Sequence, residues 1–451
     1  MGGMDSPHVP AVGGNDERRM KQQTDGIPFV MRILVLTNLY PPHYIGGYEL
    51  RCRDITEALH ARGHEVCVLT SDHHISKADP EPERSYPVRR SLKLHGFFGH
   101  PWLGIHNLQS QEQYNNSTLM AAIQQFEPDL VHVWNLGGLS KSLALTLQRL
   151  NIPTVFDVSD HWIARSLTAD VWLDWWNRPQ GSLPSRLLRG VWQINGTRQR
   201  WDRTAPTNPV QHLRFSRIYF CSRRLRDITE EAGYPVHHGA VIHCPVDIER
   251  FQGQPKPASA PLSKLLYVGR LAEDKGVLTA LKALHAVRGR FKGSLSIYGH
   301  GDPCYESMLK DYAATYELPV TFHHATPAQM PEVYRNHDAL LFTSEWEEPF
   351  ALTPLEAMAS GLPVIGTTTG GSAELLRHGD NALTYTAGNA RELAAEILTL
   401  EEDNLLRARL AATGHAEVRE KFPLQTIATQ IEDYLQESLH SWRVSSLPQY
   451  Q

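Results

Sequence analysis

The chain has 451 residues, of which 41% are hydrophobic and 21% charged, a composition typical of a globular protein with two or three domains. Its 44 basic and 49 acidic residues leave a net charge of −5, which argues against the broad basic surface of a nucleic-acid-binding protein. Five cysteines stand far apart without a C-x-x-C pair, which fits reduced thiols better than a disulfide framework.

The first thirty residues are polar, rich in Gly and Pro, and lack the apolar segment of a secretion signal. We therefore expect 1–30 to be a disordered extension. The sequence holds no run of 18 uncharged apolar residues and so predicts no membrane-spanning helix. These features predict a cytoplasmic protein, with peripheral contact at the inner membrane surface as an open alternative.

Strands and helices alternate from residue 31 to residue 251. The first apolar run, 31–37, has the uniform hydrophobicity of a strand buried on both faces of a sheet. The apolar residues that follow recur at helical spacing: Tyr48, Cys52, Ile55 and Leu59. Further strands are predicted at 65–70, 129–134, 153–158 and 217–220 and around Val241. This alternation predicts a parallel sheet covered by helices on both faces.

A Pro- and Ser-containing stretch, 252–263, interrupts the pattern and reads as a linker. A second series of strands follows: 264–269, 295–299, 319–324, 338–343, 363–367 and 382–385. The sequence therefore predicts an α/β fold of two tandem Rossmann-like, doubly wound domains, 31–251 and 264–422, with a ligand cleft at the carboxyl ends of both sheets. We expect a C-terminal helix and tail, 423–451, to pack back on the first domain.

Residues 161–216 fit no simple unit of this pattern. They hold six tryptophans among several arginines: Trp162, Trp172, Trp175, Trp176, Trp192 and Trp201. One interpretation is an aromatic-rich helical insertion packed on its own domain. The other is an acceptor-recognition or membrane-surface element, because Trp beside Arg is typical of interfaces.

The segment Glu348–Glu356 places two carboxylates eight positions apart around a predicted helix start. Thr353 would be the N-cap, Pro354 the first helical residue and Glu356 the third. Free backbone N–H groups and the positive end of the helix dipole would then face the preceding loop, where they could hold a diphosphate. The open alternatives are that Glu356 merely completes a capping box and that Glu348 is a surface acid.

Three motifs follow one another in the second half of the chain: LLYVGRLAEDKG, SEWEEPFALTPLEAMASGLPVIGT and TGGSAELLRHGDNAL. Their order and spacing resemble the GT-B glycosyltransferases, specifically retaining glycosyltransferase family 4 with its glycosyl transferases group 1 domain. The resemblance runs from about Met31 to Phe422. It implies two Rossmann-like domains facing a central cleft and metal-independent sugar transfer from a nucleoside-diphosphate sugar, with retention of configuration, to a saccharide, lipid-linked or small-molecule acceptor.

The resemblance also implies roles for charged residues. Arg270 and Lys275 would bind the donor diphosphate, where positive charge stabilises the leaving group. Glu348 would face the transferred sugar, and together with Asp160 these residues form the expected catalytic set. Glu356 would accept hydrogen bonds from the ribose hydroxyls.

Backbone groups complete the donor site that the resemblance implies. Gly46 and Gly47 are similar to the family's glycine loop near the diphosphate, where the missing side chain permits close approach. The amides of Phe350, Ala351 and Leu352 would cradle the distal phosphate or the sugar. No Asp-x-Asp motif or cofactor motif is present, so we expect neither a metal site nor a cofactor besides the donor substrate.

The chain departs from the family pattern at FDVSDHW, 156–162. Ser159 stands where the family commonly has His, whereas Asp160 and Trp162 match. Ser159, the neighbouring His161 and Glu374 of the GG-x-x-E element are therefore further candidate site residues. The departure leaves a catalytically silent nucleotide-sugar-binding protein open as a rival function. A GT-B sugar-nucleotide epimerase is a second rival, from another enzyme class.

Overall fold

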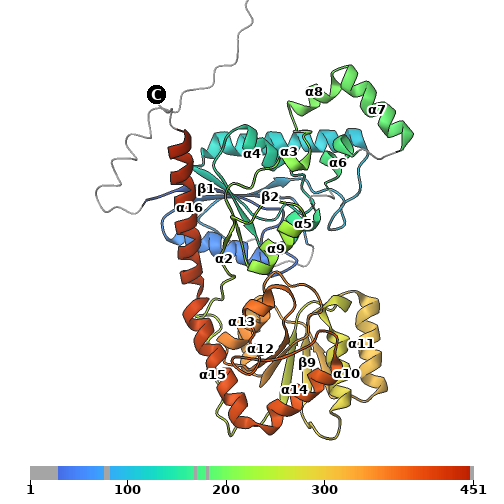
Figure 1. Cartoon of the computed structure of the whole chain (residues 1–451), viewed down its shortest axis with the longest axis vertical. Coiled ribbons are helices and arrows are strands. Elements are labelled where there is room, and N and C mark those ends of the chain that lie inside the picture. The colour runs from blue at the N-terminus through green and yellow to red at the C-terminus, as the bar shows by residue number, and fades with distance from the viewer. Residues whose placement is uncertain (1–28, 76–81, 167–169, 179–181, 447–451) are drawn as a thin grey trace, which may run out of the picture.

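The computed structural model describes residues 29–75, 82–166, 170–178 and 182–446. It has two α/β domains, one above the other in Figure 1, and the C-terminal helices run along one side of both. The predicted disordered extension, 1–30, lies almost wholly outside the described residues, as does the end of the predicted tail.

Within these ranges, the first domain contains one parallel sheet of seven strands in the order β3-β2-β1-β4-β5-β6-β7. The strands are β1 (Arg32–Leu36), β2 (Glu65–Ser71), β3 (Val88–Leu92), β4 (Leu130–Val133), β5 (Thr154–Val158), β6 (Ile218–Phe220) and β7 (Ala240–Val241). The helices are α2 (Gly47–Ala61), α3 (Ile105–Phe126), α4 (Ser142–Arg149), α5 (Trp162–Ser166), α6 (Val171–Asn177), α7 (Leu183–Ile194), α8 (Thr197–Asp202), η1 (Val210–His212) and α9 (Arg223–Glu231). The strand order reverses between β1 and β4, and such a reversal is where open α/β sheets bind their ligands.

The second domain, as far as it is described, has a parallel sheet of six strands in the order β10-β9-β8-β11-β12-β13. The strands are β8 (Lys264–Val268), β9 (Ser294–Tyr298), β10 (Val320–His323), β11 (Ala339–Phe342), β12 (Val364–Thr367) and β13 (Leu383–Tyr385). The helices are η2 (Glu273–Lys275), α10 (Val277–Ala286), α11 (Pro303–Thr315), η3 (Pro327–Gln329), α12 (Met330–Arg335), α13 (Leu352–Ala359), η4 (Gly370–Glu374), α14 (Ala390–Glu402), α15 (Asn404–Lys421) and α16 (Leu424–Ser446). Here the order reverses between β8 and β11.

The predicted architecture of two tandem, doubly wound parallel-sheet domains is confirmed. The sequence analysis did not identify strand β3. Its residues, VRRSL, lack a buried apolar run because β3 pairs only with β2, at the edge of the sheet. Charged side chains are common on edge strands, where they discourage pairing with other chains.

The tryptophan-rich segment forms helices α5 to α8. Its indoles pack on one another, with ring centroids 4.7 Å apart for Trp175 and Trp176 and 4.8 Å apart for Trp192 and Trp201. His106 of α3 contacts the last two rings at 5.4 and 5.9 Å. The interpretation of an aromatic-rich insertion packed on its own domain is therefore confirmed for these tryptophans.

The chain crosses between the domains at two adjacent places. The Val246 amide donates to the Phe422 carbonyl at 2.8 Å, and the Leu424 amide donates to the Val246 carbonyl at 3.0 Å. Helix α15 packs on α13 in the second domain, whereas α16 packs on α2 in the first (Figure 1). The last two helices therefore connect the outer sides of both domains.

Helix α16 supplies part of the core of the first domain. Its buried Ile431 and Leu435 belong to the same apolar cluster as Ile33 of β1 and Ile55 of α2. Each of the five cysteines is a free thiol, and only Cys304 is exposed. Among the described residues, no helix is long and apolar enough to cross a membrane.

Replacing Leu435 by Ala should lower the free energy of unfolding of the first domain by about 2–5 kcal/mol, because it leaves a cavity beneath α16. Denaturant unfolding followed by tryptophan fluorescence measures this loss. The exposed Asp433→Ala variant on the same helix is the control and should unfold like the wild type. Equal stability of the two variants would mean that α16 adds nothing to that core.

Candidate active site

Most of the predicted site residues lie in loops that leave the carboxyl ends of strands beside the two points of reversal. Gly46 and Gly47 follow β1, and Asp160 follows β5. Arg270 and Lys275 follow β8, whereas Glu348 lies between β11 and α13. Because parallel strands end at one edge of their sheet, the fold brings these distant sequence segments to the same side of each domain.

An ion pair connects two of these loops. The Lys275 ammonium lies 2.5 Å from a carboxylate oxygen of Glu348, and the Ser344 hydroxyl donates to the same oxygen at 2.6 Å. Both charged side chains are mostly covered, with 20% and 14% of their surfaces exposed. The alternative that Glu348 is merely a surface acid is therefore wrong. Partial burial weakens the screening of these two charges by solvent. The pair therefore fixes one positive and one negative charge at a defined place.

Glycines allow the backbone around Glu348 to approach its neighbours closely. A Cβ on Gly276, whose φ is +64°, would lie 2.0 Å from the Thr343 carbonyl oxygen. A Cβ on Gly370, whose φ is +59°, would lie 2.3 Å from the Glu348 carbonyl oxygen. That same oxygen accepts the Gly371 amide at 2.6 Å. A larger residue at either position would displace the loop that carries Glu348.

The first domain holds the same loop from its other side. His161 donates from Nε2 to the Glu347 carbonyl at 2.7 Å, and Ser222 donates to the Pro349 carbonyl at 2.6 Å. The ring of Trp346 lies 5.4 Å from that of His161, with the Arg165 guanidinium 4.0 Å from its centre. The residues on both sides of Glu348 are thus fixed by groups from the first domain.

His161 is therefore an interdomain contact. Burial lowers the pKa of its imidazole below the ordinary value, which favours the neutral ring. With Nε2 donating to a carbonyl, neutral His161 carries no proton on Nδ1. This buried atom has no hydrogen-bond partner among the described residues. Asp160 beside it accepts from the Asn135 amide at 3.3 Å and from the His161 backbone at 2.6 Å.

Ser159 takes part in a network within the first domain. Its hydroxyl donates to Asp157 at 2.7 Å and accepts from the Arg51 guanidinium at 2.7 Å. Arg51 and Asp157 form an almost fully buried ion pair at 2.7 Å. Both of these hydrogen bonds serve the internal pair, and a role of Ser159 at the reaction centre stays a prediction.

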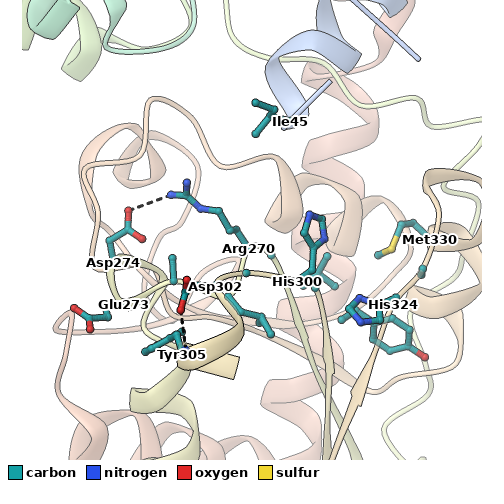
Figure 2. A pocket seen from close by; sticks show the side chains of 17 residues that line it. Ile45, Arg270, Glu273, Asp274, His300, Asp302, Tyr305, His324 and Met330 are labelled. Carbon is teal, nitrogen blue, oxygen red and sulfur yellow. Dashed lines mark hydrogen bonds and ion pairs between the residues drawn. The ribbon is translucent and has the colours of Figure 1, made fainter. Parts of the chain in front are cut away.

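A cavity of about 890 Å³ opens at the ends of β8 and β9. Figure 2 shows Arg270, His300 and Met330 of the second domain along it, with Ile45 of the first domain above them. The Arg270 side chain is 58% exposed, and its guanidinium pairs with Asp274 of its own loop at 3.4 Å. A loose, exposed pair of this kind holds Arg270 weakly and leaves it able to turn toward an anion.

A smaller cavity of about 200 Å³ adjoins the first, since Ala325 and Met330 line both. Gly47, Leu352 and Glu356 also line it. A Cβ added to Gly47 would lie 2.4 Å from the Leu352 side chain, so glycine lets the loop after β1 meet the start of α13.

Glu356 does not complete a capping box. Helix α13 starts at Leu352, with Ala351 as its N-cap and no side-chain cap, so the predicted N-cap at Thr353 and first helical residue at Pro354 are wrong. The Glu356 carboxyl instead accepts the Tyr334 hydroxyl at 2.7 Å. Burial raises the pKa of Glu356 to about 7, although the bond from Tyr334 lowers it in part.

The remaining donor-loop residues are buried. Phe350 packs between His243 and Phe422, with ring centroids at 5.0 and 6.0 Å. Ala351 is only 2% exposed. At the start of α2, Glu49 accepts the Gly46 amide at 3.0 Å, and burial raises the pKa of Glu49 to about 7.

Glu374 joins the domains and does not line either cavity described above. Its carboxylate accepts from the Arg224 backbone at 3.0 Å and from His243 at 3.1 Å. Burial alone would raise the pKa of Glu374, but the bonds from His243 and Arg224 lower it below its ordinary value. Glu374 is thus an interdomain contact in this structure, and its candidate ligand-binding role stays a prediction.

Sequence reasoning missed several residues of the site. Ser344 bonds Glu348 and lies within the second motif, four residues before that glutamate, so the motif could have indicated it. Tyr334 carries no sequence signal, because its bond to Glu356 depends on how α12 packs against α13. Among the described residues, no three His, Cys, Asp or Glu side chains gather closely enough to hold a metal ion.

Comparison with known proteins matches both halves of the chain. Residues 45–250 match the family model described as Glycosyltransferase Family 4, and residues 251–416 match Glycosyl transferases group 1. The glycogen synthase of Mycobacterium tuberculosis is 26% identical over 415 residues, which cover 88% of this chain and 93% of that protein. The D-inositol 3-phosphate glycosyltransferase of Thermobispora bispora is 28% identical over 234 residues, or 48% of this chain and 54% of that protein.

Solved structures share the fold. Anabaena HepE in complex with UDP-glucose has a TM-score of 0.63 at 20% identity, covering 90% of this chain and 100% of that chain. WaaG, a glycosyltransferase involved in lipopolysaccharide biosynthesis, has a TM-score of 0.61 at 15% identity, covering 89% and 99%. At such identities these likenesses show the arrangement of the two domains alone.

The raised pKa of Glu356 predicts a pH-dependent stability. Between its ordinary pKa of 4.5 and its folded value of about 7, the folded state keeps a proton that the unfolded chain has lost. Stability therefore falls as the pH rises through this window. The Glu356→Gln variant lacks this penalty, and its unfolding free energy relative to wild type should rise by about 1–3 kcal/mol between pH 4.5 and 7.5.

Urea denaturation at the two pH values measures this difference. Glu332→Gln, a change at an exposed acid on α12, is the control and should follow the wild type. A pH dependence that Glu356→Gln leaves unchanged would show that the Glu356 carboxyl is already ionised in the folded protein at pH 4.5.

Proposed function

The chain belongs to the glycosyl transferases group 1 and is a GT-B glycosyltransferase that uses nucleotide sugars, and from this premise we propose that it transfers the sugar to an acceptor hydroxyl with retention of anomeric configuration. The observation that carries the proposal is the Lys275–Glu348 pair, held at 2.5 Å in the loops after β8 and β11. It sets a cation and an anion side by side at the point where the strand order reverses.

Donor binding would replace ion pairs within the protein by ion pairs between the same cations and the donor diphosphate. The diphosphate would take Lys275 from Glu348 and draw the exposed Arg270 away from Asp274. The two cations, with the free amides at the start of α13, would then neutralise the negative charge that builds on the leaving group. Glu348, released from Lys275, would accept hydrogen bonds from the sugar and stabilise positive charge near the anomeric carbon.

The smaller cavity suits the ribose of the donor. Glu356 lines it and already accepts a hydrogen bond from the Tyr334 hydroxyl. A buried carboxyl that keeps one free oxygen can accept hydrogen bonds from further hydroxyl groups. The adjoining larger cavity, with His300 and Met330 along it, would then take the base.

The transfer step requires no strong side-chain base. The bond between the anomeric carbon and the diphosphate oxygen breaks, and its electron pair leaves with the diphosphate. The acceptor oxygen bonds to the same face of the carbon, and its proton passes to the departing phosphate oxygen. Asp160 and the neutral His161, on the first-domain side, would position the acceptor, which is a saccharide, a lipid-linked saccharide or a small molecule.

Loss of either cation should weaken donor binding. A thermal-shift screen with nucleotide sugars, beginning with UDP-glucose, identifies a donor that raises the melting temperature of the wild type. Arg270→Ala and Lys275→Ala should each raise the donor's Kd roughly tenfold or more, because each removes a charge-assisted bond to the diphosphate. Lys421→Ala, which removes an exposed ion-pair partner at 3.1 Å on α15, should bind like the wild type.

Glu348→Gln should separate binding from turnover. This variant should retain the donor-induced thermal shift but release nucleoside diphosphate at least roughly 100-fold more slowly, because a neutral amide stabilises positive charge poorly. NMR of the product formed with a panel of acceptors should show the anomeric configuration of the donor. An inverted product would refute retention, and full turnover by Glu348→Gln would refute its catalytic role. Interconversion of nucleotide sugars without acceptor would instead indicate an epimerase.

A further inference from the structure

Helix α7 presents an apolar stripe to solvent. Its large aliphatic side chains are 55–89% exposed: Leu183, Leu187, Val191 and Ile194. At 3.6 residues per turn these four positions fall within roughly 80° of arc around the helix axis. Four neighbouring aliphatic side chains on one face form a continuous surface and are not scattered exposed residues.

The opposite face of α7 is anchored. Trp192 lies about half a turn around the helix from the stripe, is 9% exposed and contacts Trp175 and Trp201 at 5.3 and 4.8 Å. Arg189 donates to the carbonyls of Trp175 and Arg178 at 2.9 and 2.6 Å. The tryptophan cluster therefore orients the helix and directs its apolar stripe outward.

The surroundings of the stripe are basic. Residues 182–203 contain five arginines: Arg186, Arg189, Arg198, Arg200 and Arg203. They contain one acid, Asp202, and its carboxylate is paired with Arg149 at 2.8 Å. Helix α7 itself has no acidic residue. A partner that covers this surface must be apolar within and negatively charged around its edge.

The shape of the region favours a flat partner. Figure 1 shows α7 and α8 projecting from the first domain at the end of the molecule remote from the second domain. A stable protein–protein interface buries roughly 1,200–2,000 Å², more than one short stripe of four side chains supplies. A lipid surface needs only an amphipathic helix with apolar and basic faces, which enters about 5–10 Å below the headgroups.

We infer that α7 is an interfacial anchor that inserts Leu183, Leu187, Val191 and Ile194 into an anionic lipid surface, with the exposed arginines nearby at the headgroups: Arg186, Arg200 and Arg203. Basic residues near an anionic leaflet are attracted to it, and salt screens this attraction. The anchor holds the first domain, from which the acceptor would be presented, against the bilayer. Binding to lipid requires no donor. If the protein did not bind lipid, the proposed transfer reaction would therefore be unaffected.

Co-sedimentation of the full-length protein with vesicles tests the anchor. One set of vesicles contains phosphatidylcholine alone, and the other contains equal parts of phosphatidylcholine and phosphatidylglycerol. The wild type should bind the anionic vesicles at least about tenfold more tightly than the neutral ones, and less tightly as salt is raised. The double variant Leu187→Glu/Val191→Glu should lose at least about tenfold in affinity for the anionic vesicles.

Leu405→Glu is the matched control. Leu405 is 72% exposed, but it lies on α15 of the second domain, and its replacement should leave binding unchanged. An unchanged melting temperature of every variant, followed by circular dichroism without ligand, shows that each is folded. Equal binding to both kinds of vesicle, or wild-type binding by the double variant, would overturn the inference. The inference would also be overturned if the wild type bound no vesicle and light scattering showed it to be a dimer, with the double variant a monomer.

Discussion

The loop between β11 and α13 is the constraint on which the rest of the site depends. Lys275 and Ser344 of the second domain hold the Glu348 side chain, at 2.5 and 2.6 Å, and Gly371 holds its carbonyl. His161 and Ser222 of the first domain hold the carbonyls on either side of it. Both domains therefore form hydrogen bonds to one short loop. The contacts that hold the two domains together also fix the position of Glu348 in the site.

The charges in this site differ in how firmly they are held. Lys275 and Glu348 are mostly covered and directly paired, whereas Arg270 is 58% exposed and loosely paired at 3.4 Å. An exposed pair of the second kind adds little to stability. A partly buried pair adds more by positioning than by net energy, because desolvation offsets much of the attraction. The site thus combines a cation in a fixed position, Lys275, with a more loosely held cation, Arg270. This combination suits the binding and release of a negatively charged group.

Sequence patterns predicted those features that depend on short segments. The doubly wound domains follow from alternating apolar runs, and the motifs placed Lys275, Glu348 and Glu356 in the cleft region. Helix α13 begins at Leu352, before the predicted first helical residue Pro354. Proline is tolerated at the observed position because amides of the first turn lack helical partners. Sequence patterns did not determine the roles of Glu374, Ser159 and α7. Partners distant in the chain decide whether such residues face a ligand, a neighbouring side chain or solvent.

The exchange of partners by Lys275 is the central claim, and a crystal structure with a bound nucleotide sugar tests it most directly. The Lys275 ammonium should leave Glu348 and lie within about 3 Å of a diphosphate oxygen, with the Glu348 carboxylate turned to the sugar hydroxyls. A donor whose diphosphate lies elsewhere, while Lys275 and Glu348 are still paired, would contradict it.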